Sequence, residues 1–315
     1  MNKNCVTSFN LAYITFCILF LLPYSAPAEE RGSHDIRASI LAGTWYPGNP
    51  EELSKAIQGY LSRVKQTGVD GTLKALIVPH AGYVYSGPVA AHGYRLLQKT
   101  QFTRVILVGP SHRMSFAGVS VNLQSGYETP LGIVPVDQEL ATKILKTGPH
   151  TRWLRKVHSG EHSLEIQLPF LQTVLQNFKI VPLIMGQQDF ETCSHLSKTI
   201  AQVLSDAEDT LIIASSDLSH FHSYHQAQAL DRVFIERVGM FDPKGLSKDL
   251  LSGKCEACGG GPVITVLLAA RELGANRTAI LNYANSGDVT GDHRRVVGYL
   301  SAAVIRSSDT GPHPR

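Results

Sequence analysis

The chain has 315 residues, of which 43% are hydrophobic and 17% are charged, and its formal net charge is +3. This is the composition of an ordinary globular protein, long enough for one large domain or two small ones. The small net charge, without a run of lysine or arginine, gives no sign of a nucleic-acid-binding surface, so we expect no nucleic-acid partner.

The N-terminal segment has the pattern of a secretory signal. Lys3 is its only charge, residues 11–22 are nearly all apolar, and Ala26-Pro27-Ala28 precedes two glutamates. These are the parts of a cleavable signal peptide, so we expect residues 1–28 to be removed and the mature protein to be secreted or periplasmic. It would then keep no integral membrane segment. The alternative is an uncleaved anchor, because residues 9–26 nearly suffice to cross a bilayer.

After a loose segment that ends at Arg37, the apolar pattern predicts one domain over residues 38–306 and a frayed, disordered tail at 307–315. Short, continuous apolar runs are typical of strands buried on both faces of a sheet. The expected strands are residues 75–78, 105–108, 180–184, 211–214 and 296–305.

Apolar residues at helical spacing alternate with these strands. The expected helices are residues 49–68, a helix that begins at Glu161 and carries the stripe Leu164, Leu168, Leu171 and Leu175, and residues 262–273. Alternating strands and helices predict an α/β fold, a single layered domain in which helices flank a central, largely parallel or mixed sheet.

Histidines follow three of the predicted strands. His80 comes after residues 75–78, His112 after 105–108 and His220 after 211–214. One such histidine is usually structural or exposed. Because ligands bind beyond the carboxyl ends of strands in open α/β sheets, we expect the three to share a pocket.

The predicted helix start at Glu161 adds polar groups. His162 and Glu165 are three residues apart and would therefore share one helix face. Glu161 itself is explained as an acidic residue that complements the helix dipole, whereas His162 is poorly explained in that way.

Three cysteines remain beyond the signal: Cys193, Cys255 and Cys258. An odd number leaves at least one thiol outside any intramolecular bridge. Cys258 precedes a glycine-rich turn and a predicted helix, a position that lowers the pKa of a thiol and favours the thiolate that binds metals. From the spacing alone, a metal ligand and a Cys255–Cys258 disulfide are equal alternatives, and inert loop cysteines are a third.

Five separated motifs occur in a fixed order along the chain. They are Pro79-His80-Ala81-Gly82-Tyr83, Gly109-Pro110-Ser111-His112, His162-Ser163-Leu164-Glu165, Ser215-Ser216-Asp217-Leu218-Ser219-His220, and Cys258-Gly259 followed by Pro262. Together they resemble the Memo family (AmmeMemoRadiSam system protein B) over about residues 38–305.

The resemblance implies the fold of the LigB-like class III extradiol dioxygenases, in which two histidines and a carboxylate hold Fe(II). The two histidines match His80 and His112, and a cysteine that matches Cys258 takes the place of the carboxylate. By the same resemblance, His220 is similar in position to the histidine that acts as the base in those dioxygenases.

The resemblance also implies supporting roles for Asp217, Glu165 and His162. Asp217 and Glu165 would orient metal-bound histidines through hydrogen bonds, or would instead bond backbone groups at a helix start.

The expected function is that of a metal-dependent oxidoreductase. His80, His112 and Cys258 would bind Fe(II) or copper, and His220 would move protons during redox chemistry on an unknown small molecule. Because a thiolate is softer than a carboxylate and also suits Cu(I) or zinc, the fold does not imply ring cleavage.

Two other functions use the same residues. The pocket would sequester metal or hold the end of a partner peptide, as the family's link to receptor tails suggests, or would form a zinc hydrolase site.

The signal segment and Cys255 depart from the family pattern. A Cys255–Cys258 disulfide that empties the site on oxidation is one expectation, and Cys255 as an exposed thiol without a role is the other.

Overall fold

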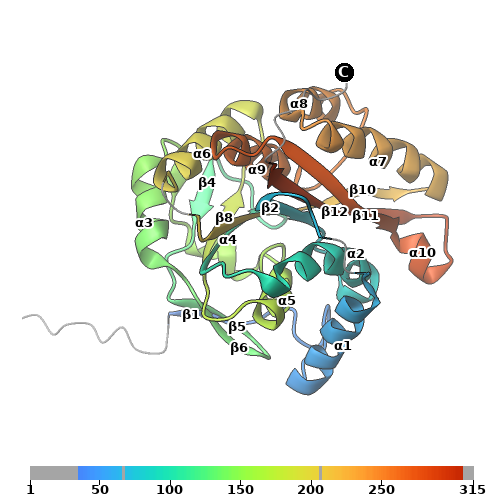
Figure 1. Cartoon of the computed structure of the whole chain (residues 1–315), viewed down its shortest axis with the longest axis horizontal. Helices are drawn as coiled ribbons and strands as arrows, with labels where there is room; N and C mark the ends of the chain where they lie inside the picture. Colours follow the sequence, from blue (N-terminus) through green and yellow to red (C-terminus); the bar gives the residue numbers. More distant parts are fainter. Residues whose placement is uncertain (1–34, 66–67, 206–207, 308–315) are drawn as a thin grey trace, which may run out of the picture. The chain divides into compact units, whose positions relative to one another are not determined.

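A computed structural model describes residues 35–65, 68–205 and 208–307 (Figure 1). The expected signal peptide and residues 308–315 of the expected tail lie outside the described residues. Ser307, where we expected fraying to begin, is buried, and its N–H donates a hydrogen bond of 2.9 Å to Asn276 Oδ1. Among the described residues, none of the helices has the length and apolar character that crossing a membrane requires.

Nine strands of the described residues form one mixed sheet in the order β10-β12-β2-β9-β3-β8-β4-β7, with β11 also paired to β12. Their bounds are β2 Thr72–Val78, β3 Arg104–Pro110, β4 Val119–Val121, β7 Thr151–Arg152, β8 Lys179–Met185, β9 Thr210–Ser215, β10 Asp217–His222, β11 Arg277–Asn285 and β12 Val296–Arg306. A second, three-stranded sheet contains β1 Ile36–Arg37, β5 Gly126–Thr129 and β6 Gly132–Pro135.

The centre of the large sheet is parallel. Strands β2, β9, β3 and β8 run in the same direction, while β12 pairs antiparallel with β2 and β4 antiparallel with β8. Their side chains are almost all buried, as expected for strands covered on both faces. The predicted α/β fold with a mixed sheet is confirmed, and so are the five predicted strands.

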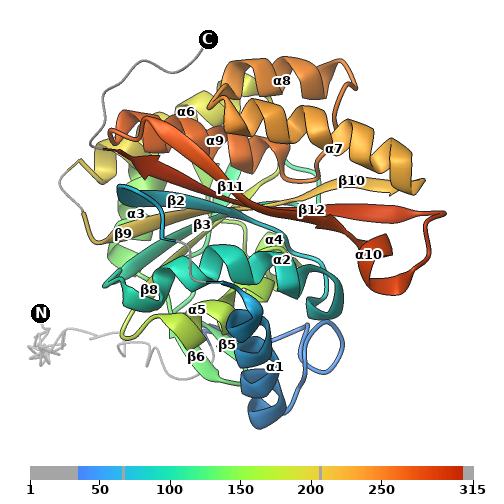
Figure 2. The ribbon, with the colours of Figure 1, turned by 45° about the vertical axis from the view of Figure 1, so that its right-hand side comes forward.

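Helices cover both faces of this sheet. The bounds are α1 Pro50–Arg63, α2 Tyr83–Arg95, α3 Gln138–Thr147, α4 Arg155–Ser159, α5 Leu168–Val174, α6 Phe190–Val203, α7 Tyr224–Gly239, α8 Pro243–Leu251, α9 Gly260–Glu272 and α10 Ser286–Thr290, with 3-10 turns η1 Leu96–Lys99 and η2 Glu165–Gln167. Figure 2 shows α1, α2 and α5 on one side and α6, α7, α8 and α9 on the other.

Helix α1 illustrates how local signals position the fold. Asn49 Oδ1 accepts hydrogen bonds from the N–H groups of Glu51 and Glu52, and Pro50 occupies the first turn. The apolar residues Leu53, Ile57 and Leu61 of this helix are fully buried. The helix ends at Arg63 rather than at the expected residue 68.

Two predicted segments differ from the structure. Glu161 does not begin a helix: residues 160–164 form a loop, and helical structure starts at Glu165. The segment after β9 is not a loop, because Asp217–His222 forms β10 against β12, with irregular register and with Phe221 at φ +64°. His220 therefore lies on a strand and not just beyond one.

Candidate metal centre

Three of the predicted residues converge at one edge of the large sheet. His80 lies two residues beyond β2, His112 two residues beyond β3, and Cys258 two residues before α9. One potential ligand atom from each lies within 4.8 Å of the others. Because β2 and β3 point the same way with β9 between them, their carboxyl ends deliver both histidines to this edge.

His80 is held as a neutral imidazole. Its side chain is buried, Nδ1 lies 2.9 Å from Ser215 Oγ, and Nε2 lies 3.1 Å from Cys258 Sγ. Burial, followed by repulsion from His112 and other histidines, lowers the pKa of His80 well below its usual range. The Ser215 contact leaves Nε2 as the nitrogen that faces the centre.

The thiol of Cys258 does not behave as its position before a helix suggested. Burial, followed by the charge of Asp217, raises the pKa of this thiol, although the Asp217 N–H donates a 3.3 Å hydrogen bond to Sγ. Desolvation therefore outweighs the helix N-terminus. The sulfur therefore keeps its proton at neutral pH.

His112 is oriented by a carboxylate, but not by the one expected. Glu161 Oε1 lies 2.9 Å from His112 Nδ1, and Oε2 accepts a 2.6 Å hydrogen bond from the His112 main-chain N–H. Burial raises the pKa of Glu161, but the hydrogen bonds from His112 lower it by more, so that the pKa falls to about 2. A charged Glu161 fixes the tautomer with Nδ1–H and leaves His112 Nε2 for a ligand.

His162 lies beside these groups. Its ring centroid is 4.3 Å from that of His112, 5.4 Å from that of His80 and 4.6 Å from that of Trp45. Burial lowers the pKa of His162 to about 4, so the ring is neutral at physiological pH. His162 Nδ1 is 3.4 Å from Glu161 Oε1, without the geometry of a hydrogen bond.

Glu165 lies elsewhere, which corrects its expected role beside a metal-bound histidine. Its buried carboxylate accepts hydrogen bonds from the segment at and after β1, namely from Arg37, Ser39, Ile40, Leu41 and Tyr46. Because no helix begins at Glu161, His162 and Glu165 do not share a face. Glu165 anchors the N-terminal segment instead.

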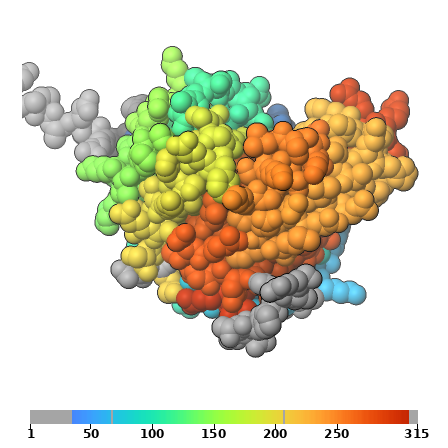
Figure 3. Space-filling model, turned by 90° about the horizontal axis from the view of Figure 1, so that it is seen from above, coloured from blue at the N-terminus to red at the C-terminus, as the bar shows by residue number. Residues whose placement is uncertain are grey.

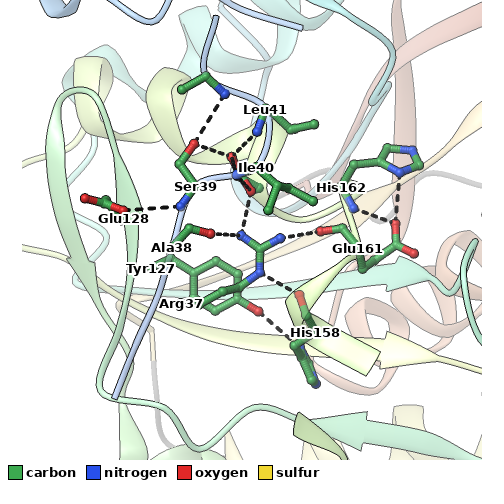
Figure 4. Close-up of polar contacts among 12 residues, drawn as sticks. Arg37, Ala38, Ser39, Ile40, Leu41, Tyr127, Glu128, His158, Glu161 and His162 are labelled. Carbon is green, nitrogen blue, oxygen red and sulfur yellow. Dashed lines mark hydrogen bonds and ion pairs between the residues drawn. The ribbon is translucent and has the colours of Figure 1, made fainter. Parts of the chain in front are cut away.

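Arg37, which sequence reasoning left in a loose segment, connects this anchor to the site. Its side chain is 3% exposed and forms an ion pair with Glu165. It also donates hydrogen bonds of 2.6 Å to the carbonyl oxygens of His158 and Glu161 (Figure 4). Arg37 thereby fixes the loop that carries Glu161.

Asp217 supports His80 through the backbone. Its Oδ1 accepts a 2.7 Å hydrogen bond from the His80 main-chain N–H. This is a backbone contact, as in the second expected role, but His80 precedes α2 and is not at the helix start. Burial raises the pKa of Asp217 to about 7.

His220 lies near these groups but outside the three-residue cluster. It lies on β10 between two shifts of register against β12. Burial lowers the pKa of His220, and repulsion from His112 contributes to the shift. A neutral imidazole near a candidate metal centre is able to accept a proton.

The three cysteines of the described residues, Cys193, Cys255 and Cys258, are free thiols. Cys255 is 1% exposed, so the expectation of a solvent-exposed thiol is wrong. Burial raises its pKa to about 11. Cys193 is also buried, and its sulfur contacts the Gly261 carbonyl oxygen at 3.4 Å.

Comparison with known proteins adds to this geometry. A family model described as Memo-like protein matches residues 37–303. A MEMO1 family protein of Methanopyrus kandleri is 37% identical over 279 residues, which cover 85% of this chain and 98% of that protein. One of Methanocaldococcus jannaschii is 39% identical over 284 residues, covering 85% and 99%.

A solved structure shares the fold alone. The crystal structure of an uncharacterized protein from Escherichia coli K12 matches with a TM-score of 0.52 at 14% identity, covering 74% of this chain and 99% of that one.

Proposed function

The chain belongs to the Memo family, and from this premise we propose that it is a metal-dependent oxidoreductase whose Fe(II) or copper ion is held by His80, His112 and Cys258. The observation that carries the proposal is the convergence of two imidazoles and one thiol, with ligand atoms within 4.8 Å of one another. The substrate is an unknown small molecule.

The donor set fits such an ion. Ser215 and Glu161 hold the Nδ1 atoms of His80 and His112, which directs both Nε2 atoms to the centre. Imidazole and thiolate together suit iron, copper and zinc. When bound, a redox-active ion supplies electron transfer and a coordination position for a small molecule.

The surrounding residues prepare the site for proton transfer. His220 has a lowered pKa and is therefore unprotonated at neutral pH, so a ring nitrogen accepts a proton from the substrate. The His162 ring packs between Trp45, at 4.6 Å between ring centroids, and His112, so aromatic rings cover one side of His112.

The test is oxygen consumption by the reduced protein loaded with Fe(II) or copper, in the presence of candidate substrates. His220→Ala is expected to keep its metal and to lose turnover, because a proton-transfer residue need not be a ligand. Loss of metal in that variant would show that His220 is a ligand instead.

A second function, sequestration of a soft metal or binding of a peptide end without catalysis, is favoured by the Cys258 thiol. A buried sulfur beside His80 Nε2 is a donor suited to Cu(I). This function predicts tight copper binding and no oxygen consumption with any substrate tried, whereas the oxidoreductase predicts metal binding together with oxygen consumption.

A further inference from the structure

We propose that the protein carries a second divalent-metal site, formed by His150, Glu191 and His195. Each side chain offers one ligand atom, and the three atoms lie within 4.8 Å of one another. The two imidazole rings have centroids 4.9 Å apart. None of these residues belongs to the centre formed by His80, His112 and Cys258.

Two of the ligands come from one face of α6. Glu191 and His195 are four residues apart, so the helix brings their side chains together without any contribution from the rest of the fold. Pairs of ligands at this spacing are how helices commonly present zinc ligands. The Asp189 carboxylate accepts a 2.9 Å hydrogen bond from the Thr192 N–H, which secures the first turn of the helix.

The third ligand is fixed in place by a glycine. The His150 carbonyl oxygen accepts a 2.9 Å hydrogen bond from the Val119 N–H, beside Gly118, which has φ +77°. A Cβ at Gly118 would lie 2.2 Å from that oxygen, so only glycine allows this approach. The Gly118 carbonyl also accepts a 3.0 Å hydrogen bond from the Gly186 N–H, just before α6.

The same strand end therefore positions the loop that bears His150 and the loop that leads into α6. In Figure 3 the green and yellow parts of the chain lie side by side on the surface, in agreement with the packing of α3 against α6. The three ligands are held close together before any ion binds.

His195 provides an independent indication of a ligand. Its Nδ1 atom is shielded from solvent and has no hydrogen-bond partner within the described part of the chain. A shielded polar atom without a partner is unfavourable, and a metal ion satisfies it.

The donors identify the class of metal. Two imidazole nitrogens and one carboxylate oxygen are the ligands of many zinc sites, and Cu²⁺ and Ni²⁺ also accept them. The site contains no thiolate, which disfavours Cu(I). Three protein ligands at an exposed position leave room for water or for a fourth group.

The experiment uses the untagged chain with His112→Ala and Cys258→Ser, which removes two ligands of the first centre and breaks the neighbouring group His112, Glu161 and His162. Dialysis against Zn²⁺ is expected to give about one ion per chain by elemental analysis. Adding His195→Ala or Glu191→Gln is expected to weaken binding by at least about tenfold, since loss even of an outer-shell partner weakens metal sites by that much. His225→Ala, an exposed histidine on α7, is the matched control and should leave zinc binding unchanged.

Cobalt provides a second measurement that does not require the double variant. The otherwise unaltered chain carrying His195→Ala is expected to bind one Co²⁺ fewer than wild type and to keep the thiolate-to-cobalt absorption of the first centre. No saturable Zn²⁺ binding in the double variant, or binding that His195→Ala and Glu191→Gln leave unchanged in both backgrounds, would overturn the proposal.

Discussion

Glu161 concentrates several interactions on one buried carboxylate. Besides its two contacts with His112, its Oε1 accepts 2.9 Å hydrogen bonds from the main-chain N–H groups of His162 and Ser163. These donors stabilise the charge that orients His112. The sequence places Glu161 49 residues from His112, so no local pattern reveals the pair.

Glu161→Gln is expected to weaken metal binding by about 10- to 100-fold, because the metal-bound histidine loses the carboxylate that fixes its tautomer. Glu128→Gln, which changes an exposed carboxylate on β5, is the matched control. Titration with Fe(II) or Cu(I) under reducing conditions measures the difference. Equal affinities for both variants and wild type would mean that Glu161 has no part in the centre.

At the scale of elements, the short strand β1 and the 3-10 turn η2 are joined by one buried ion pair, between Arg37 and Glu165. Arg37 and Glu165 are 128 residues apart in the sequence, and both side chains are almost inaccessible to solvent. Arg37→Met is expected to lower the free energy of unfolding by about 3–5 kcal/mol, because it leaves a buried charge on Glu165 unpaired.

Arg155→Met is the control for this prediction, since Arg155 pairs with Asp35 at the surface. Its expected cost is at most about 1 kcal/mol. Urea unfolding compares the two variants, and equal losses of stability would contradict the buried role of Arg37.

The strands that the sequence predicts are those whose burial is nearly complete. The continuous apolar runs of β2, β3, β8 and β9 are a direct consequence of cover on both faces. Strand β10 was not predicted because its residues, Asp217 to His222, are mostly polar. They join the sheet only by pairing with β12, which is distant in the sequence. The two-residue β1 is too short to carry any periodicity.

At the scale of the whole molecule, buried neutral histidines link stability to pH. His158 is fully buried, with Nδ1 3.1 Å from Tyr127 Oη and Nε2 3.0 Å from Ser120 Oγ. Burial, followed by the charge of Arg37, lowers the pKa of His158 to about 3. The unfolded chain, with a histidine pKa of about 6.5, takes up this proton first as the pH falls.

The free energy of unfolding should therefore decrease as the pH falls from about 6.5 towards 3, with His158 contributing on the order of 5 kcal/mol in full. His158→Asn is expected to flatten this dependence in metal-free protein, whereas the exposed His225→Asn should not. Identical slopes for wild type and His158→Asn would exclude His158 as a source of the pH dependence.

The candidate site was predictable where topology alone brings residues together. His80 and His112 follow parallel strands, so their proximity follows from the sheet, and the family motif adds Cys258. The supporting contacts of Glu161, Arg37 and Glu165 were not predictable. They form around the loop at residues 160–164, and the spacing of the leucines that follow predicted a helix there instead.

The central claim is that Cys258 is a metal ligand together with His80 and His112. Its most direct test is elemental analysis of Cys258→Ser, purified and loaded with Fe(II) or copper under reducing conditions, beside Cys255→Ser as the control for a neighbouring buried thiol. Loss of most of the first-centre metal from Cys258→Ser, with the fold intact by circular dichroism and full loading of Cys255→Ser, is the predicted result. Full metal occupancy in Cys258→Ser would contradict the account.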